Sequence, residues 1–354
     1  MTRAVIIGSG SEIAPTRVTN EQMARIMDTS DAWIRERSGV EQRYFATPEI
    51  ATSDLGVGAA AKALAAAGVA KQEVDMVVFA TMTPDHYFPG CGTILQDKLG
   101  LRTVPCYDIR QQCSGFLYGL QLADAQIRAG LARTVLLVGA EVHIGFMPWT
   151  NENFAYAIGA SDVPPTKQEW DWISRVRHLV VLFGDAGAAV VLRATEDGER
   201  GVVDHELHGS GADYEKLYVP GTGSRYRPYT DPEQFRRGDH MPVMDGRYVF
   251  KMATTSMVEV ARSLLAKHGV RPEQLKLVLM HQANKRINEY CAKALGLRED
   301  QVPHNIHKYG NTTAATIPLL WDECVRDGRL QPGDLVLMVA FGAGMTWGAS
   351  LVRA

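Results

Sequence analysis

The stretch Ala66-Ala67-Gly68-Val69 and the apolar run Val74-Asp75-Met76-Val77-Val78-Phe79 after it decide the fold, because both occur twice. They return 201 residues later as Lys267-His268-Gly269-Val270 and Leu275-Lys276-Leu277-Val278-Leu279-Met280. Each copy is typical of a helix end, a glycine stop and a buried strand. Repetition in register over this length indicates a duplicated unit.

Two further segments also occur twice, and their offsets differ. The predicted helix from Cys113 to Gly130 has a counterpart 198 residues later, from Asn311 to Gly328. Phe183-Gly184-Asp185-Ala186-Gly187 matches Phe341-Gly342-Ala343-Gly344 at an offset of 158. Strands and helices alternate, so we expect an α/β fold with a largely parallel sheet. A pseudo-two-fold axis would bring Cys113 and Asn311, at equivalent helix starts, into one shared pocket.

The predicted halves are residues 1–198 and 199–354. The fall in offset from 198 to 158 means that the first half carries about 40 extra residues, which lie between Val138 and Phe183. An insertion of this length is expected to be a lid or a subunit contact. Residues 202–243 are predicted to be irregular.

The insertion carries the signature of a short helix of its own. Thr166 and Glu169 have the spacing of a capping box. Trp170 and Ile173 would share one face of the helix that follows. We therefore expect an ordered excursion here.

Composition bounds the class of protein. The 354 residues are 46% hydrophobic and 22% charged, as in ordinary globular proteins. A formal net charge of -3 provides no basic field, so no nucleic-acid partner is expected. Five cysteines without a CxxC pair argue against a disulfide framework and a zinc site, and favour a reducing cytoplasm. Residues 1–8 enter a short strand-like run directly, so neither a targeting segment nor a membrane span is expected.

Cys113 is the candidate nucleophile, because Gln112-Cys113-Ser114-Gly115 places a thiol where an extended segment becomes a helix. Unpaired backbone N–H groups and the helix dipole at that position favour the thiolate. The alternative is a small buried hydrophobe, which is the usual role of a free cysteine.

Three other groups are candidates for chemistry or binding. His281 follows a predicted strand at the sheet edge where α/β proteins bind ligands, although a lone histidine is often structural. Asn311 could donate N–H to an oxyanion or simply cap its helix. Trp33 and Arg37 lie four residues apart, as a stacking pair for a flat ligand or as a tryptophan under an arginine stem.

Read together, Gln112-Cys113-Ser114-Gly115, His281-Gln282-Ala283-Asn284 and Tyr309-Gly310-Asn311-Thr312-Thr313 resemble the motifs of β-ketoacyl-acyl carrier protein synthase III, of the thiolase-like superfamily. The resemblance spans nearly the whole chain. It implies a duplicated thiolase-like fold of five layers, αβαβα, in a homodimer. It also implies acyl-CoA and malonyl-acyl carrier protein as substrates, with no cofactor and no metal.

By the same resemblance, Cys113 would carry the acyl group while His281 and Asn311 stabilise the enolate formed when the malonyl thioester loses CO2. The backbone N–H groups of Cys113 and Ala343 would form the second oxyanion hole. The remaining implied residues each have a binding role: Trp33, Arg37, Arg177, Gly246 and Asn284 for CoA and its pantetheine arm, Phe88 (of this chain or across the dimer) and Phe183 for the acyl pocket, and Lys251, Arg286 and Lys293 for carrier-protein docking.

The chain departs from the family pattern between Glu141 and Arg177, where it is longer. Because that region borders the family's acyl pocket, we expect a primer other than acetyl, either longer or unusual. Arg177 is assigned only by its distance from Phe183.

Three other functions are considered. An acyltransferase to an oxygen or nitrogen acceptor would need a base more than an enolate-stabilising pair, so Asn311 counts against it. Thiolases and hydroxymethylglutaryl synthases use a second cysteine or a nearby glutamate, and the neighbour of Cys113 is Gln112. A non-catalytic partner subunit should have lost its thiol.

Overall fold

Two β-sheets form the framework of the chain in the computed structural model, which describes residues 2–354. Met1, where the predicted first half begins, lies outside the described residues. The first sheet contains, in spatial order, β1 (Arg3–Ile13), β7 (Ala186–Thr195), β6 (Thr134–Glu141), β4 (Met76–Ala80) and β5 (Cys106–Ile109). The second contains β11 (Leu277–Met280), β12 (Leu335–Gly342), β13 (Thr346–Arg353) and β8 (Gly201–Gly209).

In each sheet one strand runs against all the others. β7 pairs antiparallel with both β1 and β6, whereas β4 is parallel to β6 and β5. In the second sheet β13 is likewise antiparallel to its two neighbours, and β11 is parallel to β12. Apart from one reversed strand in each sheet, the strands of a sheet all point the same way, as expected for a largely parallel sheet. The reversed strand makes its own pairings antiparallel.

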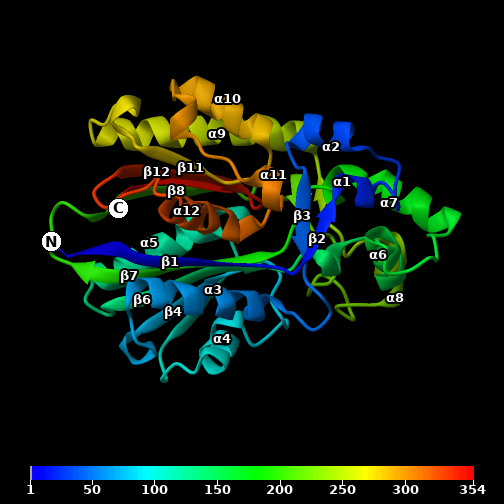
Figure 1. Cartoon of the computed structure of the whole chain (residues 1–354), viewed down its shortest axis with the longest axis horizontal. Helices are drawn as coiled ribbons and strands as arrows, with labels where there is room; N and C mark the ends of the chain where they lie inside the picture. Colours follow the sequence, from blue (N-terminus) through cyan, green and yellow to red (C-terminus); the bar gives the residue numbers. More distant parts are fainter. Residues whose placement is uncertain (1) are drawn as a thin grey trace.

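Helices cover both sheets and fill the space between them (Figure 1). The central layer contains α5 (Gly115–Arg128) and α12 (Thr316–Arg326). The outer layers are α3 (Thr52–Ala67) with α4 (Cys91–Leu99) on the first sheet, and α9 (Gly246–Lys267) with α10 (Lys285–Leu295) on the second. The predicted five-layered αβαβα arrangement is confirmed.

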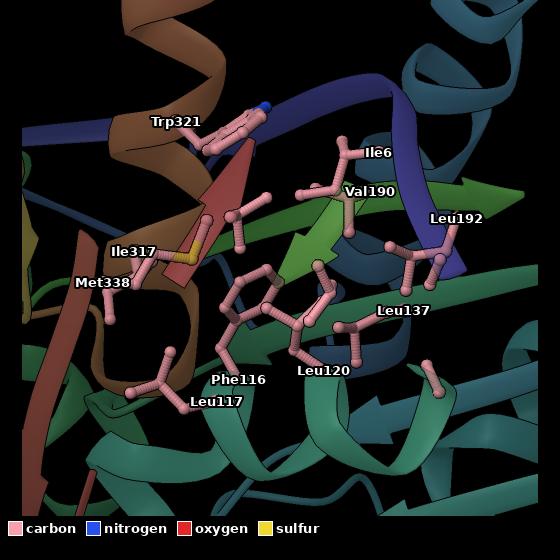
Figure 2. Close-up of a cluster of buried hydrophobic side chains, with 14 of the residues drawn as sticks. Ile6, Phe116, Leu117, Leu120, Leu137, Val190, Leu192, Ile317, Trp321 and Met338 are labelled. Carbon is pink, nitrogen blue, oxygen red and sulfur yellow. The ribbon is translucent and has the colours of Figure 1, made fainter. Parts of the chain in front are cut away.

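The central helices bury their apolar faces against both sheets (Figure 2). Phe116 and Leu120 of α5 and Trp321 of α12 meet Val190 of the first sheet and Met338 of the second, all at most 2% exposed. Each such side chain contributes about 1.5–3 kcal/mol of transfer free energy. This shared core holds the two sheets at a set distance and orients the starts of α5 and α12.

The duplication predicted from sequence is visible in the strands. β4 and β11 begin 201 residues apart, as do β6 and β12, and β1 and β8 begin 198 apart. The prediction that residues 202–243 are irregular was wrong, because they contain most of β8 and also β9 (Leu217–Tyr218), α8 (Pro232–Arg237) and the start of β10 (Val243–Met244). The strand β8 is the longest of these elements. Its sequence, Gly-Val-Val-Asp-His-Glu-Leu-His-Gly, is polar because β8 is an edge strand that is only partly buried. The division at residue 198 stays a prediction.

The first half's insertion is ordered and lies with the smaller elements at one end of the molecule (Figure 1). It contains α6 (Asn151–Ile158), which was not predicted, and α7 (Lys167–Val180), which is longer than the short helix expected. The capping box of Thr166 and Glu169 is confirmed, with Thr166 Oγ1 accepting from the Glu169 N–H at 3.3 Å. The other elements are α1 (Asn20–Met23), α2 (Asp31–Ser38), α8 (Pro232–Arg237), α11 (Ile306–Tyr309), β2 (Thr16–Thr19), β3 (Gln42–Phe45), β9 (Leu217–Tyr218) and β10 (Val243–Met244).

The excursion has a core of its own. Ile173 of α7 is fully buried with Ile26 and Ile34 of the N-terminal segment. Within residues 2–354, no helix has the length and apolar character that crossing a membrane requires.

Gly139 gives a direct test of how tightly the two halves meet. A Cβ at this position would lie 2.4 Å from the carbonyl oxygen of Ala314, which is backbone and has little room to shift. We expect Gly139→Ala to lower the free energy of unfolding by about 1–3 kcal/mol, measured by urea denaturation. Gly145→Ala is the matched control, because its Cβ would meet nothing within 4 Å. Equal stability of the two variants would contradict the close packing described here.

Candidate active site

Cys113 lies in the 3₁₀ turn of residues 112–114 that leads from β5 into α5. The turn packs against the end of β12, in the other half of the chain. A Cβ on Gly342 would lie 2.9 Å from the Cys113 Cβ, so only glycine permits this approach. The Ser114 hydroxyl donates to the Thr346 carbonyl at 3.0 Å and holds the turn on the second sheet. The thiol therefore sits where the two halves touch.

The environment of Cys113 favours the thiol over the expected thiolate. Burial, with a smaller contribution from the negative charge of Glu141, raises the pKa of Cys113 to about 12. The backbone N–H groups of Cys113 and Ala343 face the sulfur and act in the opposite direction. The helix start therefore provides N–H donors, but desolvation outweighs their effect on the pKa.

Glu141 is a buried carboxylate at the end of β6, and sequence reasoning marked it only as a boundary of the insertion. Its carboxylate accepts from the hydroxyls of Thr81 and Thr83 at 3.0 and 2.6 Å and from the Met82 N–H at 3.1 Å. Burial raises the pKa of Glu141 despite these bonds. These hydrogen bonds fix the segment that directly follows β4, near the turn that carries Cys113.

His281 follows β11 and is buried, at 3% exposed. Its Nδ1 lies 2.7 Å from Thr316 Oγ1, whereas Nε2 has no hydrogen-bond partner within residues 2–354. Burial lowers the pKa of His281 to about 3, so the ring is neutral near pH 7. A neutral imidazole held at Nδ1 offers Nε2 to an incoming ligand.

Asn311 is both a cap and a potential donor. Its Oδ1 accepts from the Thr313 N–H at 2.8 Å, which settles the amide orientation and leaves the Nδ2 group facing away from the turn. Its backbone N–H donates to the Leu182 carbonyl at 2.7 Å. A Cβ on the preceding Gly310, at φ 67°, would lie 2.7 Å from that same carbonyl oxygen. The side chain is thus placed by a turn that glycine permits.

Cys113 and Asn311 line the same cavity, but they are not equivalent in the duplication. The expectation that they occupy equivalent helix starts was wrong. The 3₁₀ turns that open α5 and α12 begin at Gln112 and Thr313, which are 201 residues apart and share a positive φ of 44° and 51°. The counterpart of Cys113 is therefore Ala314. The offset of 198 holds only at the far ends of the helices, because α12 with its turn is three residues shorter.

A cavity of about 550 Å³ joins the three candidates. Cys113, His281 and Asn311 all line it, and so does Ala343. The predicted binding residues Phe183, Gly246 and Asn284 also line it. Sequence reasoning missed several of the apolar and aromatic wall residues, which come from four separate segments: Met82, Tyr87, Phe146, Tyr214, Tyr218, Val249, Phe250 and Met257.

Asn284 has a structural role besides lining the cavity. As the N-cap of α10 it accepts from the Arg286 N–H at 2.9 Å. Its Nδ2 donates to the Arg37 carbonyl at 2.9 Å and so ties α10 to α2. Gly246 is the first residue of α9 and also lines the cavity.

Trp33 lies beneath two arginines, outside the residues that line the cavity. The guanidinium carbons of Arg37 and Arg177 lie 4.5 and 5.0 Å from the centroid of its ring. Arg177 also forms an ion pair with Asp28. The insertion helix α7 therefore delivers Arg177 to the tryptophan, as its spacing from Phe183 suggested.

Phe88 does not line the cavity, which corrects its assignment to this chain's own acyl pocket. Its side chain is 81% exposed, and the neighbouring Tyr87 takes the place in the cavity wall. The predicted docking residues Lys251, Arg286 and Lys293 are all exposed on α9 and α10. These two helices lie side by side on the outer face (Figure 1).

Comparison with known proteins places the chain in a family. The sequence is 42% identical to the β-ketoacyl-[acyl-carrier-protein] synthase III of Rhodospirillum rubrum, over 358 aligned residues that cover 100% of both chains. The chain belongs to the β-ketoacyl-acyl carrier protein synthase III family. The resemblance stated from the motifs is thereby confirmed.

Family descriptions and solved structures agree with this assignment. "3-Oxoacyl-[acyl-carrier-protein (ACP)] synthase III" matches residues 107–161, and its C-terminal counterpart matches residues 265–354. The synthase III of Aquifex aeolicus VF5 is 35% identical, with a TM-score of 0.84 over 99% of this chain and 100% of that chain. The priming β-ketosynthase of the R1128 polyketide pathway is 27% identical, with a TM-score of 0.85 over 99% and 96%. The thiolase-like fold of the synthase III family is therefore the fold of this chain.

Residues 2–354 hold no group of three or more His, Cys, Asp or Glu side chains arranged for a metal ion. The three candidate residues instead present a thiol, an imidazole and an amide to the cavity, beside the backbone N–H donors of Cys113 and Ala343. This set is suited to binding and transferring an acyl group in this synthase III chain.

The buried neutral His281 makes a prediction about acid stability. With the folded pKa lowered to about 3, the unfolded chain binds more protons below its ordinary pKa near 6.5, so stability falls as pH drops through that window. His281→Phe removes this effect. Relative to the variant, the wild type should lose about 2 kcal/mol of unfolding free energy between about pH 6.5 and pH 5, measured with urea. Replacing the exposed His86 by Phe is the control, and parallel pH curves for wild type and His281→Phe would contradict the burial effect.

Proposed function

We propose that the chain condenses an acyl-CoA primer with malonyl-acyl carrier protein, releasing CO2 and forming a β-ketoacyl product through an acyl-Cys113 intermediate. The single observation that carries the proposal is that Cys113, His281 and Asn311 line one cavity. Membership of the synthase III family, over the full length of the relatives, supports the same activity.

The first half-reaction forms the acyl-enzyme. The Cys113 sulfur bonds to the thioester carbon, the bond from that carbon to the CoA sulfur breaks, and the thiol proton leaves on CoA. The N–H groups of Cys113 and Ala343, which face the sulfur, would stabilise the oxyanion of the tetrahedral intermediate. Because burial favours the protonated thiol, the sulfur would lose its proton only as the acyl-CoA thioester arrives and is attacked.

The second half-reaction uses the other two side chains. As the malonyl carboxylate leaves as CO2, its electron pair enters an enolate whose oxygen is stabilised by Asn311 Nδ2 and His281 Nε2. The enolate carbon then bonds to the acyl carbon, and the Cys113 sulfur leaves and regains a proton. Nε2 must carry a hydrogen for this role, which requires the Thr316 hydroxyl to turn its one hydrogen from the Thr313 carbonyl to Nδ1 across the 2.7 Å contact. Burial strengthens both donors because water is excluded.

CoA is proposed to approach over α2. Its adenine would stack on Trp33 and draw Arg37 and Arg177 onto its phosphates or its second face. The pantetheine arm would then pass Gly246 and Asn284, which line the cavity. The exposed Lys251, Arg286 and Lys293 are proposed to meet the acidic carrier protein.

A homodimer is part of the proposal. The edge strand β5 and the loop before α4 expose three large aromatic side chains, Tyr87 at 61%, Phe88 at 81% and Tyr107 at 41%. Such a patch suits a second copy of the chain, with Phe88 reaching the partner's pocket. We further propose that the enzyme works in a reducing compartment such as the cytoplasm, with all five cysteines free as they are here, and that it needs no cofactor beyond its substrates.

The main test separates the two half-reactions. Cys113→Ala should abolish the mass increase that acyl-CoA produces on the intact protein. Asn311→Ala should keep that mass increase and lower condensation about 100-fold or more, because it removes an oxyanion donor. The measurements are intact-protein mass and CO2 release from malonyl-acyl carrier protein. Acyl transfer to an oxygen or nitrogen acceptor without CO2 release by the wild type would contradict the proposal.

The primer is proposed to be longer than acetyl, because the insertion adds Phe146 to an apolar cavity wall that also includes Met82 and Tyr87. The wild type should acylate faster with butyryl- or octanoyl-CoA than with acetyl-CoA. Phe146→Ala should change the ratio of kcat/KM between octanoyl- and butyryl-CoA by about 10-fold, since one altered apolar contact has this scale of effect. Phe235→Ala, on the exposed side of α8, is the control. A clear wild-type preference for acetyl-CoA would contradict the primer assignment.

A further inference from the structure

Thr313 uses all three of its polar groups around the cavity. Its N–H donates to Asn311 Oδ1 at 2.8 Å, and its carbonyl accepts from the Thr316 hydroxyl at 3.0 Å. That Thr316 oxygen also lies 2.7 Å from Nδ1 of His281. The third group, the Thr313 hydroxyl, lies 2.6 Å from Nε2 of His143. One residue thus connects Asn311, and in the resting structure the Thr316 hydroxyl beside His281, to a buried histidine.

Thr313 needs such an anchor because of its backbone. Its φ is 51°, in the left-handed region that a β-branched residue rarely adopts. A residue keeps such a strained conformation only where several surrounding contacts hold it in place. Its side chain is 1% exposed, so the hydroxyl bond is made without competition from water.

His143 is held firmly enough to serve as that anchor. Its Nδ1 lies 2.9 Å from the Gly184 carbonyl, which can only accept, so Nδ1 carries the hydrogen. When only Nδ1 carries a hydrogen, Nε2 accepts from the Thr313 hydroxyl. The His143 N–H donates to Asp185 Oδ1 at 2.6 Å, and the ring stacks on Phe183 with centroids 4.8 Å apart.

We propose that His143 is a positioning residue for the malonyl half-reaction. It holds Thr313 across the junction between the halves, and Thr313 in turn orients Asn311 through the bond from its N–H to Oδ1. This inference rests on the proposed function. It also assigns a role to a histidine that lies at the start of the insertion and does not line the cavity.

The two half-reactions should respond differently to the loss of this bond. The N–H donors of Cys113 and Ala343 do not depend on Thr313, so acylation should stay within about 2-fold of the wild type in His143→Phe. CO2 release and condensation should fall by about 10- to 100-fold, the effect of a small misplacement of catalytic groups. Phe keeps a ring against Phe183 but cannot accept the hydrogen bond.

Conservative and matched variants separate positioning from general damage. His143→Gln offers an amide oxygen to the Thr313 hydroxyl and should recover much of the condensation rate. His205→Phe removes another buried histidine, whose Nδ1 lies 2.8 Å from Ser350 Oγ, and should leave the ratio of the half-reactions unchanged. If His143→Phe fails to fold, Thr313→Val against Thr313→Ser tests the same bond, with only Val losing condensation.

A structural readout keeps the inference independent of turnover. In a crystal structure of His143→Phe, the Asn311 amide should be displaced from the Thr313 N–H. Normal condensation with an undisplaced amide, or an equal loss of both half-reactions, would overturn the role of His143. A wild type that takes up acyl groups but never condenses them would instead overturn the proposed function.

Discussion

The whole site depends on close backbone contact between the two halves. Each central strand ends against the 3₁₀ turn of the other half: Gly342 of β12 against Cys113, and Gly139 of β6 against Ala314. Neither position has room for a Cβ, so the contact requires glycine at both places. Because the contact is reciprocal, the cysteine turn and the asparagine turn are brought to one cavity by the same packing that joins the sheets.

Burial sets the charge state of the groups in that cavity. The same desolvation that raises the pKa of Cys113 lowers the pKa of His281, so both side chains are neutral at rest. Two neutral side chains have no charge to solvate and leave their hydrogen-bonding groups for substrate. Charge then develops only when an oxyanion forms, where fixed N–H donors are most effective.

The insertion changes the site without changing the framework. It enlarges the first half at the ends of its strands, where Phe146 enters the cavity wall and α7 brings Arg177 to Trp33. It also begins with His143, whose ring anchors Thr313 in the other half. If the proposed roles hold, sequence variation in this one segment would affect the proposed primer choice, the proposed CoA contact and the placement of Asn311, while the shared core stays the same.

The amino-acid sequence by itself determined the duplication, the α/β class and the family, because these are recorded in local periodicity and in short motifs around Cys113, His281 and Asn311. It missed β8, since an edge strand lacks the apolar run of a buried one. Only the tertiary structure decided that burial raises the pKa of Cys113, that Ala314 is its counterpart, and that Phe88 faces outward. Desolvation, the register of two packed turns and the direction of a side chain all arise from contacts between segments far apart in the chain.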